Sequence, residues 1–199
     1  MGETQDKEQE SVPSLRKAVL QQRGDKRPVS IFKTADGALD VVRASSSVTV
    51  SHCHFGKQVK TMLVGNDDGG SEDKIQTVTL YANFFEDCVS RMPRVRYGTA
   101  HVCSNVFKHW GRYVLGASNG GHILAENNYF IPGSDNQIDH FHPPDPNDNS
   151  VISFRGNRLY GSAVRNSNEE DRFGIPFTCP ALEEANIISE AGVGSWCTL

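Results

Sequence analysis

Short apolar segments alternate with polar turns from residue 36 to residue 160, a pattern typical of β-strands rather than helices. Five of these segments resemble one another as copies of a single unit. They are VTVSHCHF (48–55), VTLYANFF (78–85), AHVCSNVF (100–107), ILAENNYF (123–130) and ISFRGNRL (152–159). An internal repeat of this length predicts a solenoid in which each unit forms one turn.

One position of the repeat holds asparagine in four of the five copies, with an apolar residue two places later. The residues at this position are spaced by 30, 22, 23 and 29 residues, and they are Cys53, Asn83, Asn105, Asn128 and Asn157. An asparagine at a bend between strands bonds to backbone groups and tolerates left-handed backbone angles. Asparagines of successive turns would also bond to one another. The sequence therefore predicts an all-β fold, a parallel β-helix.

The flanking segments lack the repeat and divide the chain into three parts. Residues 1–30 form a charged, partly disordered lead with a short helix at 13–23, and RPVSIF (27–32) reads as a strand. Residues 31–165 form the β-helix, and residues 166–199 form a tail or cap. We expect a helix over ALEEANIISEA (181–191), which would cap or flank the solenoid because open ends need covering.

Composition and charge exclude several classes of protein. Hydrophobic residues make up 37% and charged residues 22% of the chain, which indicates a folded domain. The net charge of −4 argues against a nucleic-acid partner bound through its phosphates. No apolar run approaches the roughly 20 residues of a membrane span, and the polar N-terminus shows no signal-peptide core. We expect a monomer without a membrane partner.

The cysteine pattern gives little support for a zinc site, because none of the cysteines forms a CxxC pair. The chain has five, at Cys53, Cys88, Cys103, Cys179 and Cys197. The last two lie in the C-terminal stretch and would either bridge it or remain unpaired thiols.

Two carboxylates in ADGALDV form the first candidate chemical cluster. Asp36 and Asp40 are four residues apart, so in a strand they face the same side. Two carboxylates on one face suit a hard cation such as Ca²⁺, although such a pair is more often solvated surface. The polar loop NDDGGSEDK, with Asp67, Asp68 and Asp73, is read the same way, as a second calcium site or as a solvated turn.

Cations form the second cluster. Lys60 precedes the apolar strand KTMLVG, and RMPRVRYG carries Arg91, Arg94 and Arg96 around Pro93. Alternation places Arg94 and Arg96 on one face if the segment is extended and Pro93 does not redirect the chain. Guanidinium and ammonium groups together suit anionic sugar carboxylates, whereas the alternative is a basic surface strand.

Four other side chains are ambiguous from sequence. His101 reads as a structural histidine. Tyr97, Trp110 and Tyr113 are either core residues or sugar-stacking residues, with the core favoured.

These motifs, in this order and spacing, resemble the plant-type pectate lyases of polysaccharide lyase family 1. The resemblance covers about Asp36 to Phe130 and includes the five-residue separation of Arg91 and Arg96. It implies a right-handed parallel β-helix and Ca²⁺-dependent β-elimination of de-esterified pectin (polygalacturonate). It also implies a secreted protein of the cell wall.

The resemblance assigns a role to each matching residue. Asp36 and Asp40 fall on two acidic Ca²⁺ ligands, and Lys60 falls on a lysine that contacts a substrate carboxylate. Arg91 falls on the proton-abstracting arginine, and Arg96 on an arginine that holds the uronate. We expect Arg94 to bind substrate beside Arg96.

The chain departs from the family upstream of DGALDV. SLRKAVLQQRGDKRPVSIFK resembles the family's early segment, but in the family several turns and another acidic Ca²⁺ ligand lie between the two. An internal deletion would weaken Ca²⁺ binding and change the neighbour of the first turn. A catalytically impaired pectin-binding β-helix is therefore the alternative function. A polygalacturonase-type hydrolase is disfavoured, because clustered catalytic aspartates are absent.

Overall fold

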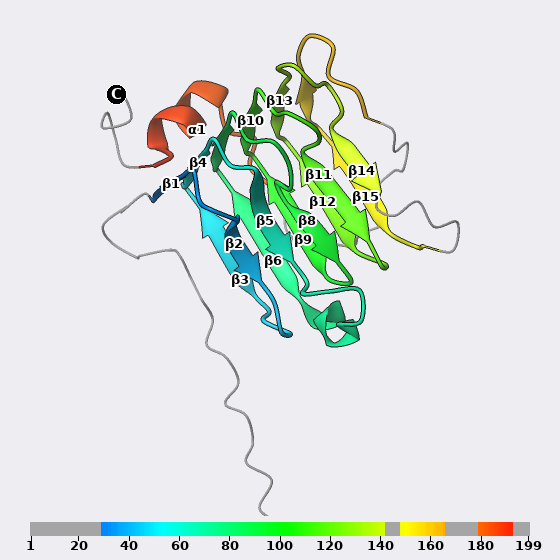
Figure 1. Cartoon of the computed structure of the whole chain (residues 1–199). Helices are drawn as coiled ribbons and strands as arrows, with labels where there is room; N and C mark the ends of the chain where they lie inside the picture. Colours follow the sequence, from blue (N-terminus) through cyan, green and yellow to red (C-terminus); the bar gives the residue numbers. More distant parts are fainter. Residues whose placement is uncertain (1–28, 142–147, 166–178, 193–199) are drawn as a thin grey trace, which may run out of the picture.

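The protein is described by a computed structural model over residues 29–141, 148–165 and 179–192 (Figure 1). The expected N-terminal lead and the helix expected at 13–23 lie outside the described residues. The strand expected at 27–32 is present at its end, as β1 (Ser30–Phe32). The boundaries predicted at residues 30 and 165 stay a prediction, while the strands themselves run from Ser30 to Leu159.

Strands of successive turns pair in parallel to form three sheets. Sheet 1 contains β3 (Val48–Ser51), β6 (Thr77–Tyr81), β9 (Thr99–Cys103), β12 (His122–Glu126) and β15 (Val151–Arg155). Sheet 2 contains β2 (Gly37–Val41), β5 (Lys60–Val64), β8 (Arg94–Arg96), β11 (Leu115–Ser118) and β14 (Asp139–Phe141). Sheet 3 contains β1, β4 (His54–Gly56), β7 (Phe84–Glu86), β10 (Val106–Lys108), β13 (Tyr129–Ile131) and β16 (Arg158–Leu159). Each turn contributes one strand to each sheet, which confirms the predicted parallel β-helix.

A stack of phenylalanine rings fills the centre of the solenoid. Phe55, Phe85, Phe107 and Phe130 have ring centroids 5.0, 4.9 and 5.1 Å apart, with the rings nearly parallel. All four are fully buried. They occupy the apolar position of the first four repeat copies, so in these copies the position recurs because it supplies one ring to the stack.

A ladder of asparagine side chains runs beside this stack. The Nδ2 group of Asn83 donates to Oδ1 of Asn105 at 3.0 Å, and that of Asn105 donates to Oδ1 of Asn128 at 3.0 Å. Asn128 continues the ladder to Asn157 at 2.9 Å. Each Oδ1 also accepts the backbone N–H of the residue one turn earlier, beginning with Cys53. The predicted bonding between turns is confirmed.

The left-handed residue of each bend is not the asparagine but the residue before it. Positive φ angles between 50° and 62° occur at His52, Ala82, Ser104, Asn127 and Gly156. The preceding residue turns the corner, which leaves the asparagine inside the corner with its amide directed along the ladder. The expected left-handed position was therefore wrong by one residue.

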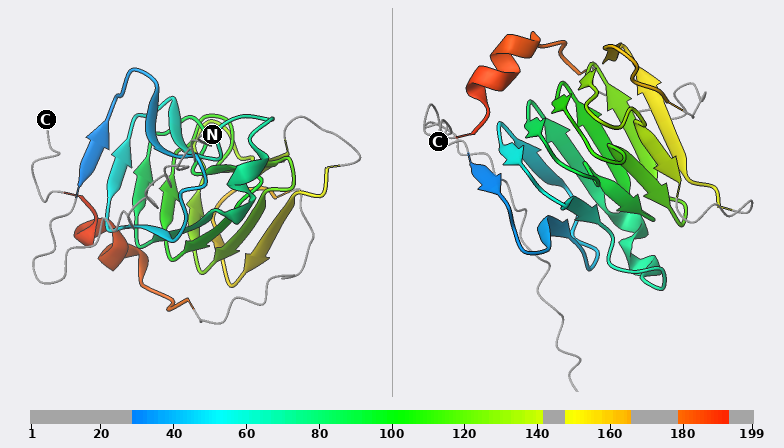
Figure 2. Two further views of the ribbon diagram at one scale, coloured as in Figure 1. Left: turned by 90° about the horizontal axis from the view of Figure 1, so that it is seen from below. Right: turned by 45° about the horizontal axis from the view of Figure 1, so that its top comes forward.

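The C-terminal helix is confirmed as α1 (Glu184–Glu190). Ile187 is buried against Phe84, Val106 and Tyr129, which belong to three neighbouring strands of sheet 3. Figure 2 shows the helix lying along the outside of the solenoid. Of the two expected positions, the helix therefore takes the flanking one. No helix among the described residues, α1 included, is long and apolar enough to cross a membrane.

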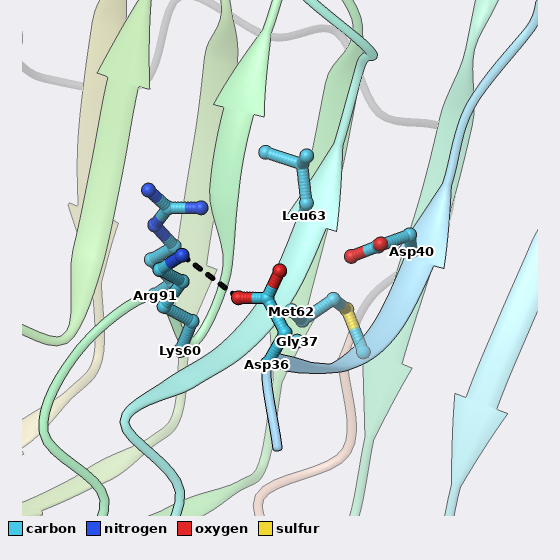
Figure 3. A pocket seen from close by; sticks show the side chains of 7 residues that line it. All are labelled: Asp36, Gly37, Asp40, Lys60, Met62, Leu63 and Arg91. Atoms are coloured by element: carbon cyan, nitrogen blue, oxygen red, sulfur yellow. Dashed lines mark hydrogen bonds and ion pairs between the residues drawn. The ribbon is translucent and has the colours of Figure 1, made fainter. Parts of the chain in front are cut away.

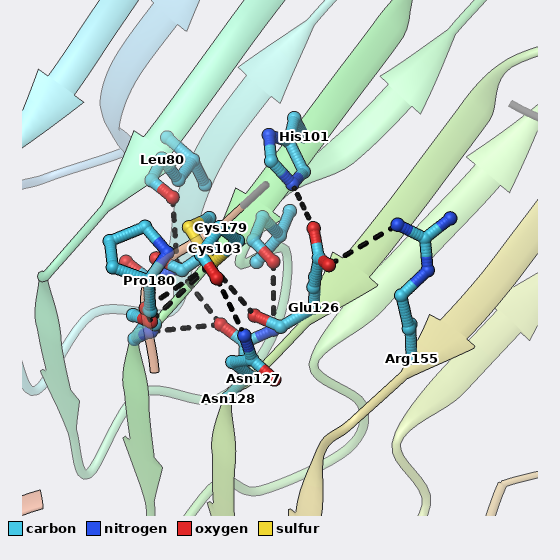
Figure 4. Close-up of a disulfide and its surroundings, with 12 residues drawn as sticks. Leu80, His101, Cys103, Glu126, Asn127, Asn128, Arg155, Cys179 and Pro180 are labelled. Carbon is cyan, nitrogen blue, oxygen red and sulfur yellow. Dashed lines mark hydrogen bonds and ion pairs between the residues drawn. A yellow bond between two sulfur atoms is a disulfide. The ribbon is translucent and has the colours of Figure 1, made fainter. Parts of the chain in front are cut away.

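A disulfide joins Cys179 to Cys103 at the end of β9, across 76 residues of sequence (Figure 4). Neither expectation for Cys179, a bridge to Cys197 or a free thiol, is correct. Cys197 itself lies outside the described residues. Cys53 and Cys88 are buried free thiols. The pairing depends on which turn the C-terminal segment crosses, and that information is absent from local sequence.

The first turn has a neighbour on one side only within the described part of the chain. β1, β2 and β3 each stand at the edge of their sheet. Val29 and Phe32 are also exposed there, at 39% and 38% of their surface. The internal deletion inferred from the family resemblance stays a prediction.

We predict that Asn105→Ala lowers the free energy of unfolding by about 3–5 kcal/mol, because several buried partners lose their bonds at once. Asn105 bonds to Asn83, Asn128, Leu80 and Cys103, and it is fully buried. Urea denaturation measures the change, with the exposed Asn186→Ala as control. Equal stability of the two variants would contradict a structural ladder.

We also predict that non-reducing peptide mapping recovers a Cys103–Cys179 crosslink. Reduction should lower the free energy of unfolding by about 2–4 kcal/mol, because the bridge restricts a long loop in the unfolded chain. A Cys179–Cys197 crosslink would show that the pairing described above is wrong.

Candidate active site

The register of sheet 2 places residues from five turns in one row on its outer face. Asp40 is the partner of Leu63, Leu63 of Arg94, Arg94 of Gly116, and Gly116 of His140. The next residues along the strands, such as Val95, point into the core and are fully buried. Arg94 and Arg96 therefore share the outer face on either side of Val95, as alternation predicts.

A small hollow on this face brings together four of the residues singled out from sequence (Figure 3). Asp36 lies in the bend before β2, Asp40 lies on β2, and Lys60 begins β5. A parallel bridge between Lys60 and Ser90 brings the following residue, Arg91, beside them. All four side chains line a space of about 80 Å³.

Asp36 and Lys60 form an ion pair inside this hollow. The Nζ atom of Lys60 lies 2.7 Å from Oδ1 of Asp36. The hydrogen bond and the charge of Lys60, with a smaller effect from Arg91, lower the pKa of Asp36. The carboxylate is therefore ionised at neutral pH, and Lys60 already has an anionic partner.

The two carboxylates have the chemistry of a calcium site but do not complete one. Asp36 and Asp40 are exposed, and a Cβ atom at Gly37 would lie 3.0 Å from Oδ1 of Asp40. The missing side chain at Gly37 thus leaves room for the Asp40 carboxylate. Two carboxylates offer at most four oxygens, whereas Ca²⁺ takes six to eight. No third carboxylate lines this hollow among the described residues, so water or ligand oxygens would fill the other positions.

Arg96 does not line the hollow. Its Nε donates to Oδ1 of Asp68 at 3.0 Å, and its Nη1 donates to the carbonyl of Asn66 at 3.1 Å. The hydroxyl of Tyr97 donates to the carbonyl of Asp68 and helps to hold the same loop. The structure therefore ties Arg96 to the acidic loop, a pairing that the sequence did not suggest.

The three aspartates of that loop have separate structural partners. Asp67 accepts the backbone N–H of Gly69 at 2.9 Å, while Asp68 pairs with Arg96. Asp73 is fully buried and accepts the backbone N–H groups of Ala44 and Asn66. These bonds favour the interpretation as a structured turn over a second calcium site.

A second hollow of about 260 Å³ adjoins the first and shares Lys60 and Arg91 with it. Arg94, Arg112 and His140 also line it. Arg94 is only 6% exposed, and burial, together with the charges of Arg96 and Arg91, lowers its pKa. Sequence reasoning missed Arg112 and His140, because each comes from a different turn and neither belongs to a recognisable motif.

His101 lies on sheet 1 and lines neither hollow. Its Nε2 is 3.1 Å from Oε2 of Glu126, whose other oxygen accepts from Arg155 at 3.3 Å (Figure 4). Burial lowers the pKa of His101, and the bond to Glu126 opposes that shift. With Cys103 and Cys179 it forms a compact group, but the disulfide occupies both sulfurs. These contacts agree with the structural reading of this histidine.

The aromatic residues divide between core and hollow. Trp110 is 1% exposed and packs edge-on against Phe130, as expected of a core residue. Tyr113 is buried too, but its ring stacks on His140 at the second hollow, with centroids 4.8 Å apart.

Comparison with known proteins identifies the family. The family model of pectate lyases matches residues 25–172. The chain belongs to the pectate lyase family. Among its curated relatives, "Probable pectate lyase P56" of Solanum lycopersicum is 39% identical over 104 residues, or 52% of this chain and 26% of the relative. "Putative pectate lyase 2" of Arabidopsis thaliana is 44% identical over 101 residues, or 50% and 26%.

Solved structures of the family share the fold. The cedar pollen allergen jun a 1 has a TM-score of 0.74 and 28% identity, covering 84% of this chain and 52% of that one. A pectate lyase from Bacillus sp. N165, solved in complex with trigalacturonate, has a TM-score of 0.73 and 22% identity, covering 84% and 58%. The match confirms the right-handed parallel β-helix. It spans about a quarter of the curated relatives and about half of these structures.

Proposed function

We propose that this chain is a Ca²⁺-dependent pectate lyase that cleaves de-esterified pectin by β-elimination. The observation that carries the proposal is the hollow that gathers Asp36, Asp40, Lys60 and Arg91 in a chain of this family. The trigalacturonate bound by the lyase from Bacillus sp. N165 supports an oligogalacturonate as the ligand.

The cations would act on the carboxylate next to the reacting carbon. The proton on C5 of galacturonate is weakly acidic, and its removal spreads negative charge onto that carboxylate. Lys60 and Arg96 would bind the carboxylate and stabilise this charge in the transition state. Calcium held by Asp36 and Asp40 would supply further positive charge there. Arg96 is 3.0 Å from Asp68, so binding substrate would require it to weaken that pair.

Arg91 would accept the C5 proton. The electron pair of the C5–H bond then forms the C4–C5 double bond, and the C4–oxygen bond breaks. The leaving oxygen takes a proton from solvent. Arg91 makes no hydrogen bond or ion pair through its side chain with any described residue, so it is free to face a sugar in the hollow.

The alternative is a catalytically impaired, pectin-binding β-helix. The incomplete oxygen set around Asp36 and Asp40 favours it, because a weakly held cation would leave the carboxylate charge uncompensated. We further propose a monomer in the extracellular space or cell wall. The Cys103–Cys179 disulfide supports such an oxidising setting.

We predict that the protein, given polygalacturonate and Ca²⁺, forms a product with the ultraviolet absorbance of a C4–C5 double bond. Arg91→Ala should lower the rate by about 10²–10⁴-fold, because the base is lost. A chelator should abolish product formation. Arg43→Ala serves as the control, since this exposed arginine lines neither hollow.

Other results of the same assay would select another function. Binding of polygalacturonate without product would support the impaired protein. New reducing ends without unsaturation would indicate a hydrolase and refute the lyase.

We predict that kcat/KM rises with pH by about tenfold per unit between neutral and alkaline pH. A guanidinium group stays almost entirely protonated across this range, so the small neutral fraction able to accept a proton grows about tenfold with each pH unit. A stopped-assay series at fixed Ca²⁺ measures the slope. A flat profile would argue against Arg91 as the base.

A further inference from the structure

The second hollow on sheet 2, which we call the guanidinium hollow, is not explained by the elimination reaction alone. Nine residues line it, and six of them are charged or aromatic: Lys60, Arg91, Arg94, Arg112, Tyr113 and His140. It lies beside the candidate active site and holds about 260 Å³. Three of the six are arginines, and no carboxylate lines the space within the described part of the chain.

The arginines of this hollow lack the partners that cations have elsewhere in the molecule. Arg96 pairs with Asp68 at 3.0 Å, Arg155 with Glu126 at 3.3 Å, and Lys108 with Glu86 at 3.5 Å. By contrast, the guanidinium groups at positions 91, 94 and 112 form no ion pair or hydrogen bond with any residue that the structure describes. Three unpaired cations around one space create a strong preference for an anion.

The burial of Arg94 indicates that the hollow is a binding site. Its residue surface is 94% buried, and its Nε atom is inaccessible to solvent without a hydrogen-bond partner. Burying a charged donor without a partner destabilises a protein unless a bound group compensates. The neighbouring Gly116 leaves the space for this arrangement, because a Cβ atom there would lie 2.9 Å from the Tyr113 ring and 3.5 Å from Cγ of Arg94.

The far wall of the hollow comes from a later turn. His140 lies two strands from Arg94 in the same outer row, which corresponds to about 10 Å across the sheet. Its ring stacks on Tyr113, and Arg112 lies next to Tyr113 in the chain. Burial, followed by the charges of Arg112 and Arg94, lowers the pKa of His140. The hollow thus extends from Lys60 and Arg91 to Arg94, Arg112 and His140. The strands β8, β11 and β14 beneath it lie side by side in sheet 2 (Figure 1).

We propose that Arg94 and Arg112 bind a second uronate carboxylate, next in the polymer to the one held at Lys60, with the Tyr113–His140 pair as the wall behind it. The guanidinium plane presents paired N–H donors that match a carboxylate. A methyl ester at this place removes the negative charge, so the hollow selects two consecutive unesterified uronates. The identity of the anion rests on the proposed function, whereas the anion preference rests on the unpaired arginines.

The first test is calorimetric binding of trigalacturonate and of its methyl ester, with chelator present so that no lyase reaction interferes. Arg112→Gln should weaken trigalacturonate binding by roughly tenfold, because an exposed charge-assisted contact is lost. The same change should leave the weaker binding of the ester unaltered. Arg43→Gln, at an exposed arginine outside both hollows, is the matched control.

The second test uses Arg94→Met, which keeps the length of the side chain and removes the buried charge. We expect thermal stability without ligand to stay equal or rise, while trigalacturonate affinity falls at least tenfold. Lower stability combined with unchanged affinity would show that Arg94 is structural and would overturn the proposal.

The lyase activity and the carboxylate site in the guanidinium hollow can be refuted independently of each other. Trigalacturonate binding that depends on Arg112 and Arg94, without any unsaturated product, supports the hollow and rejects the lyase. The opposite result is that unsaturated product forms while Arg112→Gln matches the control in trigalacturonate affinity and in preference for unesterified substrate. That result supports the lyase and overturns the proposed carboxylate site in the guanidinium hollow.

Discussion

Parallel pairing of each turn on the next is the constraint on which the rest of the structure depends. The stack from Phe55 to Phe130 and the ladder from Asn83 to Asn157 both fix the same register, one by filling the interior and the other by bonding its corners. A slip of one residue would turn every inward side chain outward. The row that carries Asp40, Arg94 and His140 on sheet 2 exists only in this register.

The cations on the outer surface fall into two groups, according to whether another turn places an acidic side chain beside them. Arg96 and Arg155 meet acidic side chains from other turns, and such contacts hold loops in position. Arg91, Arg94 and Arg112 form no ion pair with an acidic side chain of the described residues, which leaves a positive surface beside Asp36 and Asp40. A uronate polymer has the complementary charge, with one carboxylate on each sugar. The arrangement therefore suits an extended anionic chain better than a compact neutral ligand.

The sequence predicted the solenoid because its strongest signals are local and repeated. Four of the five repeat copies carry the asparagine, and four carry a phenylalanine at the apolar position two residues later. The order of the motifs placed Lys60 and Arg91 near Asp36. The partner of Cys179, the pair between Arg96 and Asp68, and the position of His140 were not predictable in this way. Each depends on how long the intervening loops are and which turn they reach, and no local pattern records that.

The ion pair between Asp36 and Lys60 links the two ligands that the proposed reaction needs. At 2.7 Å, Lys60 neutralises a carboxylate that would otherwise serve a cation. A cation at Asp36 and Asp40 would replace Lys60 as the partner of Asp36, and the released ammonium would then be available to a substrate carboxylate. Since each ligand favours the arrangement that the other requires, their binding should be cooperative, and by thermodynamic linkage the cooperation acts equally in both directions. Two carboxylates can then be enough, because substrate completes the cation site while the cation frees the lysine for substrate.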